Sequence, residues 1–194
     1  LLWDYNTLIF NGEDSVTWQL YHVGLYKRHS TTSIEQVIYS HSRAIKGICD
    51  FNTVCFHPSW PAWKQRKSTV DGVTVHEFGR ATFRGLKLPT PFTRWLANLP
   101  KPAVFHLHTK FVPMNFALMR ALRKHDISYV FTPHNPYSGD TLKRKGLLKR
   151  FYTNVVDRRL IAGAKAVHAL TNNEVATLTA LVARTLSVVP NTID

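Results

Sequence analysis

This 194-residue sequence contains no long apolar run and no CxxC pair of cysteines. No stretch approaches the roughly 18 uninterrupted apolar residues of a membrane-spanning helix, and we see no signal-peptide pattern at its start. The two cysteines, Cys49 and Cys55, form no CxxC pair, which disfavours a structural zinc site, and no metal is expected. Without a secretion signal, we expect reduced thiols and a cytoplasmic protein.

The common sequence signatures of nucleotide binding and of serine hydrolases are also absent. The chain contains neither the GxGxxG dinucleotide fingerprint nor the GxxxxGK[ST] phosphate-binding loop. It also lacks the GxSxG elbow that presents a nucleophilic serine. These absences disfavour binding of NAD or a nucleoside triphosphate through those motifs, and they disfavour hydrolysis by a serine nucleophile.

Acidic residues are scarce. Twelve Asp and Glu stand against 25 Lys and Arg, which gives a formal net charge of +13. Such an excess is typical of proteins that meet nucleic acid, an anionic membrane or phosphorylated substrates, although a merely well-solvated surface is the alternative. Residues 142–160 carry seven basic residues and one acidic residue, with apolar pairs at roughly helical spacing. This pattern predicts a basic amphipathic helix at a membrane surface.

Strand-like and helix-like segments alternate from residue 21 onward. The first 20 residues have no clear period, and the NGED turn within them predicts an extension or a short hairpin. We expect strands at 21–26, 51–57, 73–78, 103–108, 128–134, 165–171 and 186–190. We expect helices at 33–47, around 93–99, and at 113–126, 142–160 and 172–182, with a loop at 59–72. This order predicts an α/β fold for residues 21–194: one Rossmann-like domain with a doubly wound parallel sheet and helices on both faces.

The carboxyl ends of these strands are where an open α/β sheet binds its ligands. HLHTKF follows the fourth strand and TPHNPYSG follows the fifth, and both loops are rich in neutral polar groups. Sugar hydroxyls need such neutral donors and acceptors. We therefore select His108 and His134 as candidate ligand contacts. The helix start TTSIE offers backbone N–H groups to an anion or a sugar.

The two histidines of strand 103–108 receive different expectations. Since side chains alternate along a strand, we expect His106 and His108 to point to opposite faces. One of them is then a hydrogen-bonded structural histidine, and His108, which lies nearer the strand end, is the better candidate for a ligand contact. Two histidines without a convergent carboxylate do not predict a metal site.

The ordered set of motifs resembles the N-terminal domain of a retaining family 4 glycosyltransferase of GT-B fold. SIEQVIYSHSRAIKG and FNTVCFHP are similar to that family's first helix and second strand, and STVDGVTVHEF is similar to its DGV strand. VFHLH, YVFTPHNPY, AKAVHALTNNEVATL and LSVVPNTID follow in the family's order. Each motif is short, and the specificity lies in the order, which extends over about residues 21–194.

The resemblance implies roles for individual residues. His134 matches the family histidine that lies against the donor sugar, and it is the candidate catalytic residue. Thr32 and Ser33 match a glycine pair whose backbone approaches the donor, so side chains here replace bare backbone. Thr192 likewise stands where the family's hinge usually has glycine. The candidate substrate-binding residues are Thr32, Ser33, His108, Asn135 and Tyr137.

The implied reaction is sugar transfer from a nucleotide-sugar donor to an acceptor hydroxyl, with retention of configuration. The donor is a substrate, bound mainly by a C-terminal domain with a Glu-x7-Glu motif, and no cofactor is implied. We find no such domain in this chain and expect the chain alone to be inactive. The acceptor is expected to be a glycan or lipid-linked molecule of the cell envelope, with the protein peripheral on the cytoplasmic membrane face. The expected contacts to an anionic membrane or acceptor are Lys143, Arg144, Lys145, Lys149 and Arg150.

Two other functions remain open. A Rossmann-like basic module could bind nucleic acid, although no RNP, helix-turn-helix or zinc-finger pattern is present, and we expect no nucleic-acid partner. A non-catalytic sugar-binding scaffold is the second alternative, because Thr32 and Ser33 replace the glycine loop.

Overall fold

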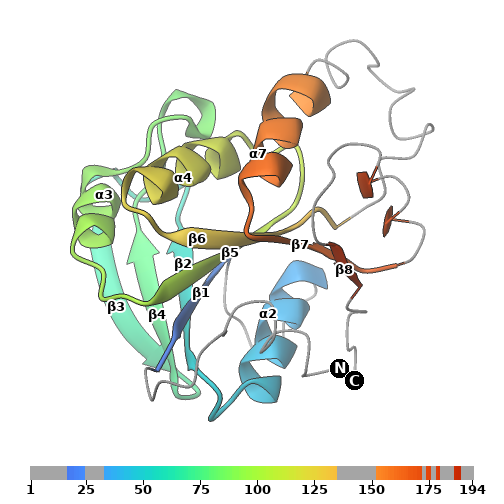
Figure 1. The fold of residues 1–194 in the computed structure, drawn as a ribbon. Coiled ribbons are helices and arrows are strands. Elements are labelled where there is room, and N and C mark those ends of the chain that lie inside the picture. The colour runs from blue at the N-terminus through green and yellow to red at the C-terminus, as the bar shows by residue number, and fades with distance from the viewer. Residues whose placement is uncertain are drawn as a thin grey trace.

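The computed structural model describes residues 17–24, 33–134, 152–171, 174–175, 178–179 and 186–188. Its strands form an eight-stranded sheet in the order β3-β4-β2-β1-β5-β6-β7-β8 (Figure 1). All neighbouring strands are parallel except β3, which is antiparallel to β4. The strand order runs outward on both sides of β1, as in a doubly wound sheet, and confirms the predicted fold class.

Most of the elements lie within a few residues of the predicted ones. The strands are β1 (Gln19–Val23), β2 (Asp50–Phe56), β3 (Gln65–Val70), β4 (Val73–Phe78), β5 (Ala103–His108), β6 (Ser128–Thr132), β7 (Ala166–Ala169) and β8 (Leu186–Val188). The helices are α2 (Ser33–Ala44), η1 (Phe83–Gly85), α3 (Thr90–Ala97), α4 (Pro113–Lys124), η2 (Thr153–Asp157) and α7 (Arg158–Gly163). The first strand therefore begins inside the segment that was expected to be an extension.

The predicted loop at 59–72 is wrong in its second half, because that half forms β3. This strand lies at the edge of the sheet and is mostly exposed on both faces, so it lacks the apolar alternation that reveals a half-buried strand. Asp71 and Gly72 have φ of 51° and 82°, and they connect β3 to β4 as a two-residue hairpin turn. The DG pair was thus a hairpin signal.

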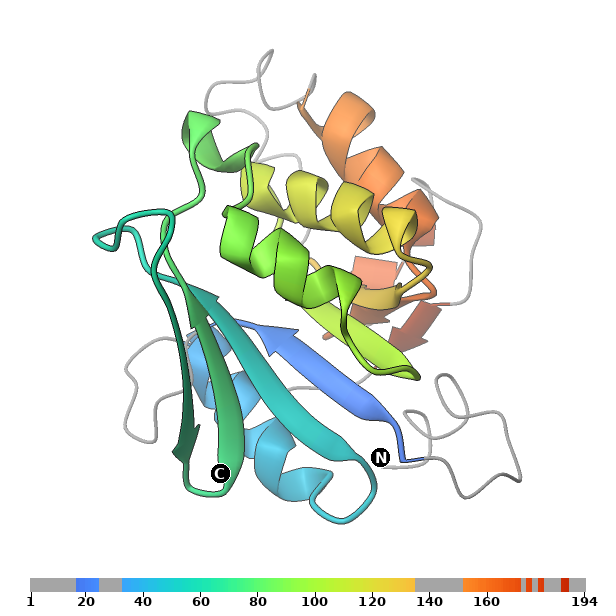
Figure 2. The ribbon, with the colours of Figure 1, turned by 90° about the vertical axis from the view of Figure 1, so that its left-hand side faces the viewer.

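Helices cover both faces of the sheet. Figures 1 and 2 show α2 on one face and α3, α4 and α7 on the other. Pro91 and Pro113 lie in the first turns of α3 and α4, where the missing N–H of proline costs no helical hydrogen bond. Gly47 follows α2 with φ of 87°, a conformation that glycine adopts without strain.

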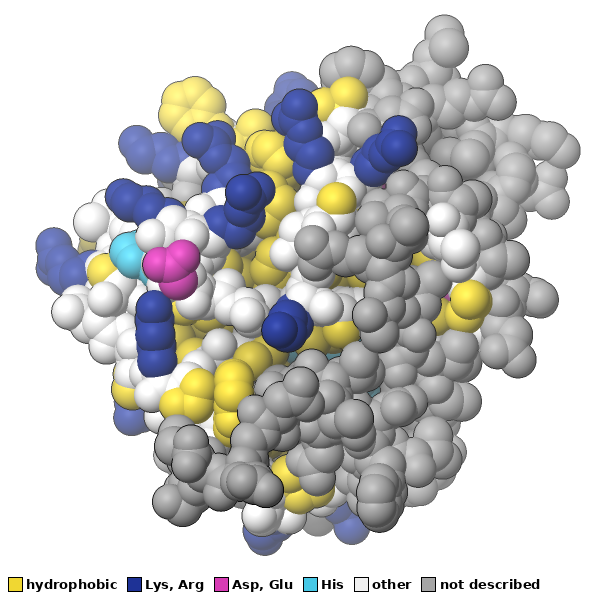
Figure 3. Space-filling model, in the orientation of Figure 1, with side chains coloured by type: hydrophobic (Ala, Val, Ile, Leu, Met, Phe, Trp, Pro, Cys, Tyr) yellow, Lys and Arg dark blue, Asp and Glu magenta, His cyan; other side chains and the backbone are white. Residues whose placement is uncertain are grey.

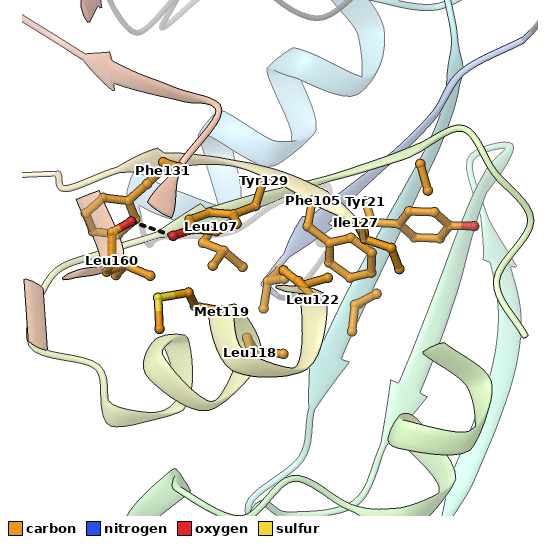
Figure 4. Packing of buried hydrophobic residues seen from close by; sticks show 14 of the residues in the cluster. Tyr21, Phe105, Leu107, Leu118, Met119, Leu122, Ile127, Tyr129, Phe131 and Leu160 are labelled. Atoms are coloured by element: carbon orange, nitrogen blue, oxygen red, sulfur yellow. Dashed lines mark hydrogen bonds between the residues drawn. The ribbon is translucent and has the colours of Figure 1, made fainter. Parts of the chain in front are cut away.

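The face under α3, α4 and α7 is an apolar core. Figure 4 shows its central strand residues packed against the helix side chains, which are almost fully buried. Its main members are Tyr21, Phe105, Leu107, Leu118, Met119, Leu122, Tyr129, Phe131 and Leu160. The hydroxyl of Tyr129 donates a hydrogen bond to the carbonyl of Leu160, at 2.5 Å, so the polar end of this tyrosine is satisfied within the core.

Several predictions concern residues outside the described part of the chain. They include the NGED turn and the basic stretch from 142 to 151. Residues 153–160 of the predicted basic helix are helical, as a π-helical turn followed by α7, and α7 continues past the predicted end to Gly163. Glu174, Val175, Leu178 and Thr179 are helical too, in agreement with the helix expected at 172–182. No helix among the described residues has both the length and the hydropathy to cross a membrane.

Candidate functional site

The sheet face under α2 changes from apolar to polar along its central strands. Near their amino ends, β1, β5, β6 and β7 present the buried side chains of Leu20, Val104, Val130 and Ala166. Two residues further along each strand, the same face presents His22, His106, Thr132 and His168, which are also buried. The parallel registers pair His22 with His106 and Val130 with Ala166, so the strands change together. A row of buried polar groups thus lies toward the carboxyl edge of the sheet.

One set of hydrogen bonds leads from this row to the edge of the sheet. His22 Nδ1 lies 2.9 Å from His108 Nε2, and His108 Nδ1 lies 2.9 Å from His134 Nε2. His22 and His108 are almost fully buried, whereas His134 is half-buried and follows the end of β6. The φ of His134 is 50°, an uncommon value for a residue other than glycine. The three imidazoles form a chain from the interior to the carboxyl edge of the sheet.

Thr132 connects two further histidines. Its Oγ1 lies 2.7 Å from His106 Nε2 and 3.1 Å from His168 Nδ1. His41 of α2 covers the cluster, with ring centroids 5.4 Å from His22 and 6.1 Å from His106. One helix and four strands therefore bring their polar side chains to one place.

The expectation that His106 and His108 point to opposite faces is wrong. Their rings stack with centroids 4.1 Å apart, on the face that α2 covers. The physical reason is the two-residue period of a strand, which puts successive residues on opposite faces and residues two apart on the same face. Both histidines belong to one cluster, and both are hydrogen-bonded.

Burial keeps these histidines neutral. It lowers the pKa of His22, His106 and His108 well below 6.5, and the neighbouring histidines lower each of them further. The pKa of His41 and of His134 falls to about 4, again mainly through burial, with His168 the next cause. At neutral pH each of these rings therefore offers one N–H donor and one lone pair.

The loop between β5 and α4 is tied to the same edge by contacts that the sequence did not reveal. The side-chain amide of Asn115 donates hydrogen bonds to the carbonyls of His108 and Thr109, each at 2.8 Å. The backbone N–H groups of Thr109 and Lys110 donate to carbonyls of the segment that ends β6. Lys110 is nearly buried, with its ammonium 5.3 Å from the centroid of the Phe111 ring. This bracing fixes the end of β5 beside His134.

The structure brings together two of the predicted site residues, His108 and His134. Ser33 is the first residue of α2, as expected. The side chain of Ser33 and the whole of Thr32 lie outside the described part of the chain. Asn135, Tyr137 and the five predicted membrane contacts, Lys143, Arg144, Lys145, Lys149 and Arg150, also lie outside the described residues. The sequence analysis did not predict His22, His41 and His168 as residues of the site. Histidines at corresponding positions of YHV, FHLH and VHAL were a signal that could have found two of them.

Comparisons with known structures agree with the fold of this chain. The chain is similar in fold to an E. coli trehalose-6-phosphate structure bound with UDP-2-fluoro glucose, with a TM-score of 0.59 and 10% identity. A structure of trehalose-6-phosphate synthase, OtsA, gives a TM-score of 0.61 and 11% identity. The match covers 91% of this chain in both cases, and 49% and 50% of those chains, so this chain spans about half their length. The comparison with curated proteins gives no significant match.

The family assignment comes from a sequence model of a protein domain. The model describes a glycosyl transferase 4-like domain, and it matches residues 46–192, well over half of the chain. The match includes β2 to β8 together with His106, His108, His134 and His168, while His22 and His41 precede it. It agrees with the resemblance carried by the ordered sequence motifs, and with a fold that covers half of each similar structure. The chain belongs to the glycosyl transferase 4-like family.

Proposed function

We propose that this chain is the acceptor-binding half of a retaining glycosyltransferase. One observation carries the proposal: in this member of the family, His134 follows the carboxyl end of β6 and is hydrogen-bonded to His108. Ligands of open α/β sheets bind at this edge. The reaction is transfer of a sugar from a nucleotide-sugar donor to an acceptor hydroxyl. The UDP-2-fluoro glucose bound in one similar structure supports a donor of that class.

In this proposal His134 acts as a neutral, oriented hydrogen-bonding group. Its Nε2 is engaged by His108, which leaves Nδ1 to face a ligand. Because burial holds its pKa at about 4, it carries no charge at neutral pH and contributes position rather than electrostatic attraction. The leaving phosphate takes the acceptor proton, and the protein contributes by aligning the reacting groups. Thr32, Ser33, Asn135 and Tyr137 complete the sugar contacts in this proposal.

The acceptor that fits the charge of the chain is a glycan carried on an anionic lipid or membrane. Figure 3 shows Lys and Arg side chains spread over the described surface in this view, with fewer Asp and Glu side chains among them. The net charge of +13 extends this excess to the whole chain. We propose that Lys143, Arg144, Lys145, Lys149 and Arg150 make the closest contacts, at the cytoplasmic membrane face.

The test is His134→Ala in the full enzyme that contains this chain. We expect kcat to fall by roughly 100-fold or more, as when a preorganised donor is lost from a closed site. The stability should change by only about 1 kcal/mol, because one hydrogen bond is lost from a half-buried side chain. The measurements are steady-state transfer from a nucleotide sugar and urea denaturation of the same preparations.

The matched control is His125→Ala. His125 follows α4 at the amino-terminal end of β6, away from the site, and its removal should leave kcat unchanged. Equal kcat for His134→Ala and the unaltered enzyme would refute the role proposed for His134.

A further inference from the structure

The inner end of the histidine chain has an unused ring nitrogen. His22 is fully buried, and its Nδ1 is bonded to His108. Its Nε2 has no hydrogen-bond partner among the residues that the structure describes. A buried polar atom without a partner costs roughly 1–3 kcal/mol, so this nitrogen calls for an explanation.

Ring nitrogens of His41 and His106 lie close to a ring nitrogen of His22. One nitrogen from each of His22, His41 and His106 falls in a set whose members are all within 4.8 Å of one another. Four-coordinate zinc with Zn–N bonds of about 2.0–2.1 Å needs nitrogens about 3.3 Å apart. The three nitrogens therefore have to approach one another when a metal binds, and half-buried His41 is the least enclosed of the three residues.

We propose that His22, His41 and His106 form a binding site for a transition-metal cation, with Zn²⁺ as the best-suited ion. Three imidazoles are a ligand set that Zn²⁺ accepts, and they leave a fourth position for water or another small ligand. Binding of the metal does not require the proposed sugar transfer. The site goes beyond the expectation from sequence, which considered only His106 and His108 and predicted no metal.

His22 and His106 already have outer hydrogen-bond partners. His22 is bonded to His108, and His106 is bonded to Thr132. Metal-binding histidines usually hydrogen-bond through the other ring nitrogen, and this fixes ring orientation and tautomer. Burial already favours the neutral form that a metal needs, so no proton has to be displaced from these ligands at neutral pH.

A metal at His22 Nε2 would also fix the protons of the whole chain of imidazoles. His22 would then carry its proton on Nδ1 and donate it to His108 Nε2. His108 would donate from Nδ1 to His134 Nε2, which leaves the proton of His134 on Nδ1. The buried metal would thereby set the hydrogen-bonding character of the nitrogen that faces the edge of the sheet.

A second group, Cys55, His57 and Glu77, has metal-like spacing but is already closed. The guanidinium of Arg66 donates to both carboxylate oxygens of Glu77, and His57 binds one of them. Burial raises the pKa of the Cys55 thiol to about 12, so the metal-free thiol stays protonated at neutral pH and a metal would have to displace its proton. This group serves as the internal control.

The test is Zn²⁺ titration of the EDTA-treated protein by calorimetry, with metal content measured after dialysis. We expect one Zn²⁺ per chain. His41→Gln should lower the affinity by more than the roughly 10–100-fold that loss of an outer partner costs, and His108→Gln should fall within that range. His57→Gln should bind as the unaltered protein does. Circular dichroism of each variant verifies folding.

Cobalt gives a second measurement on the unaltered protein. Co²⁺ in a four-coordinate nitrogen site absorbs strongly in the visible, whereas a hydrated or surface-bound ion absorbs weakly. In the zinc-loaded protein, ¹⁵N NMR should find His134 protonated on Nδ1. Absence of stoichiometric Zn²⁺ binding, normal binding by a folded His41→Gln, or loss of binding in His57→Gln would each overturn the proposal.

Discussion

The two faces of one sheet are held to their helices in different ways. Under α4, the strands present large apolar side chains such as Phe105 and Phe131, which are fully buried. Under α2, the same strands present His106 and Thr132, buried to the same degree but hydrogen-bonded to one another. An apolar face tolerates any pH, whereas a histidine face holds only while its rings are neutral. The first face is stabilised by burial of apolar surface, and the second by burial together with hydrogen bonds between its polar side chains.

A fall in pH should give the largest difference between the two faces, because the rings of the histidine face take up protons and the apolar side chains do not. The cluster histidines have lowered pKa values, so the native state binds fewer protons than the unfolded chain, in which histidine titrates near 6.5. The contribution of these histidines to the free energy of unfolding is therefore complete above about pH 6.5. It falls as the pH drops toward the native pKa values, by up to about 1.4 kcal/mol per pH unit for each histidine. Urea denaturation between pH 7.5 and 5.5, with EDTA present, measures this slope.

Two controls limit the acid experiment to the cluster. Arg66 lowers the pKa of Glu77, so the contribution of Glu77 to stability is also lost in acid. That loss occurs below pH 4.5, the ordinary pKa of the carboxyl group, and so lies outside the measured range. His76 lies beside Trp95, away from the cluster, and burial lowers its pKa to about 4. The variant His76→Gln subtracts its contribution. A flat stability profile from pH 7.5 to 5.5 would contradict the neutral histidine cluster.

Truncation of the apolar face should give the next largest effect. Phe105→Ala removes a fully buried ring that packs on Tyr21 and Trp95, and should cost about 3–5 kcal/mol through lost burial and the cavity left behind. The matched control is Phe83→Ala, since Phe83 is 77% exposed and its loss should cost less than about 0.5 kcal/mol. Urea denaturation measures both variants.

The same variant sharpens the comparison when the pH is varied. Phe105→Ala should lower the stability by a constant amount from pH 7.5 to 5.5, because the residue does not titrate. A change in the slope would show that the two faces are energetically coupled through the strands, rather than independent.

The sequence predicted the apolar face better than the histidine face. The alternation in Val73–Phe78 and the apolar run in Ala103–His108 gave the bounds of β4 and β5 as the structure has them. Local pattern suffices there because burial of an apolar stripe is a property of the segment itself. β3 was missed for the opposite reason, since an exposed edge strand buries too little to leave a pattern.

The histidine cluster depends on strand register, which no local pattern specifies. His108 and His134 were each selected from their positions at strand ends, but their hydrogen bond joins residues 26 positions apart. His22 and His108 are 86 positions apart, and their contact exists only because β1 pairs with β5. The contacts of His41 with the cluster require, in addition, that α2 packs on this face of the sheet. Such contacts follow from the assembled sheet.

The smallest effect tests whether the polar face is held by its hydrogen bonds. Thr132→Val keeps the side-chain shape but removes the hydroxyl that lies between His106 and His168, and it leaves two buried ring nitrogens without this partner. We expect a loss of about 1–3 kcal/mol in urea denaturation at pH 7.5. The matched control is Thr53→Val on β2. The hydroxyl of Thr53 is also fully buried, but it has no hydrogen-bond partner among the described residues, so its replacement should be neutral or stabilising. Equal losses at both positions would mean that a methyl group is simply tolerated poorly at this depth, and that the cluster is held by packing like the opposite face.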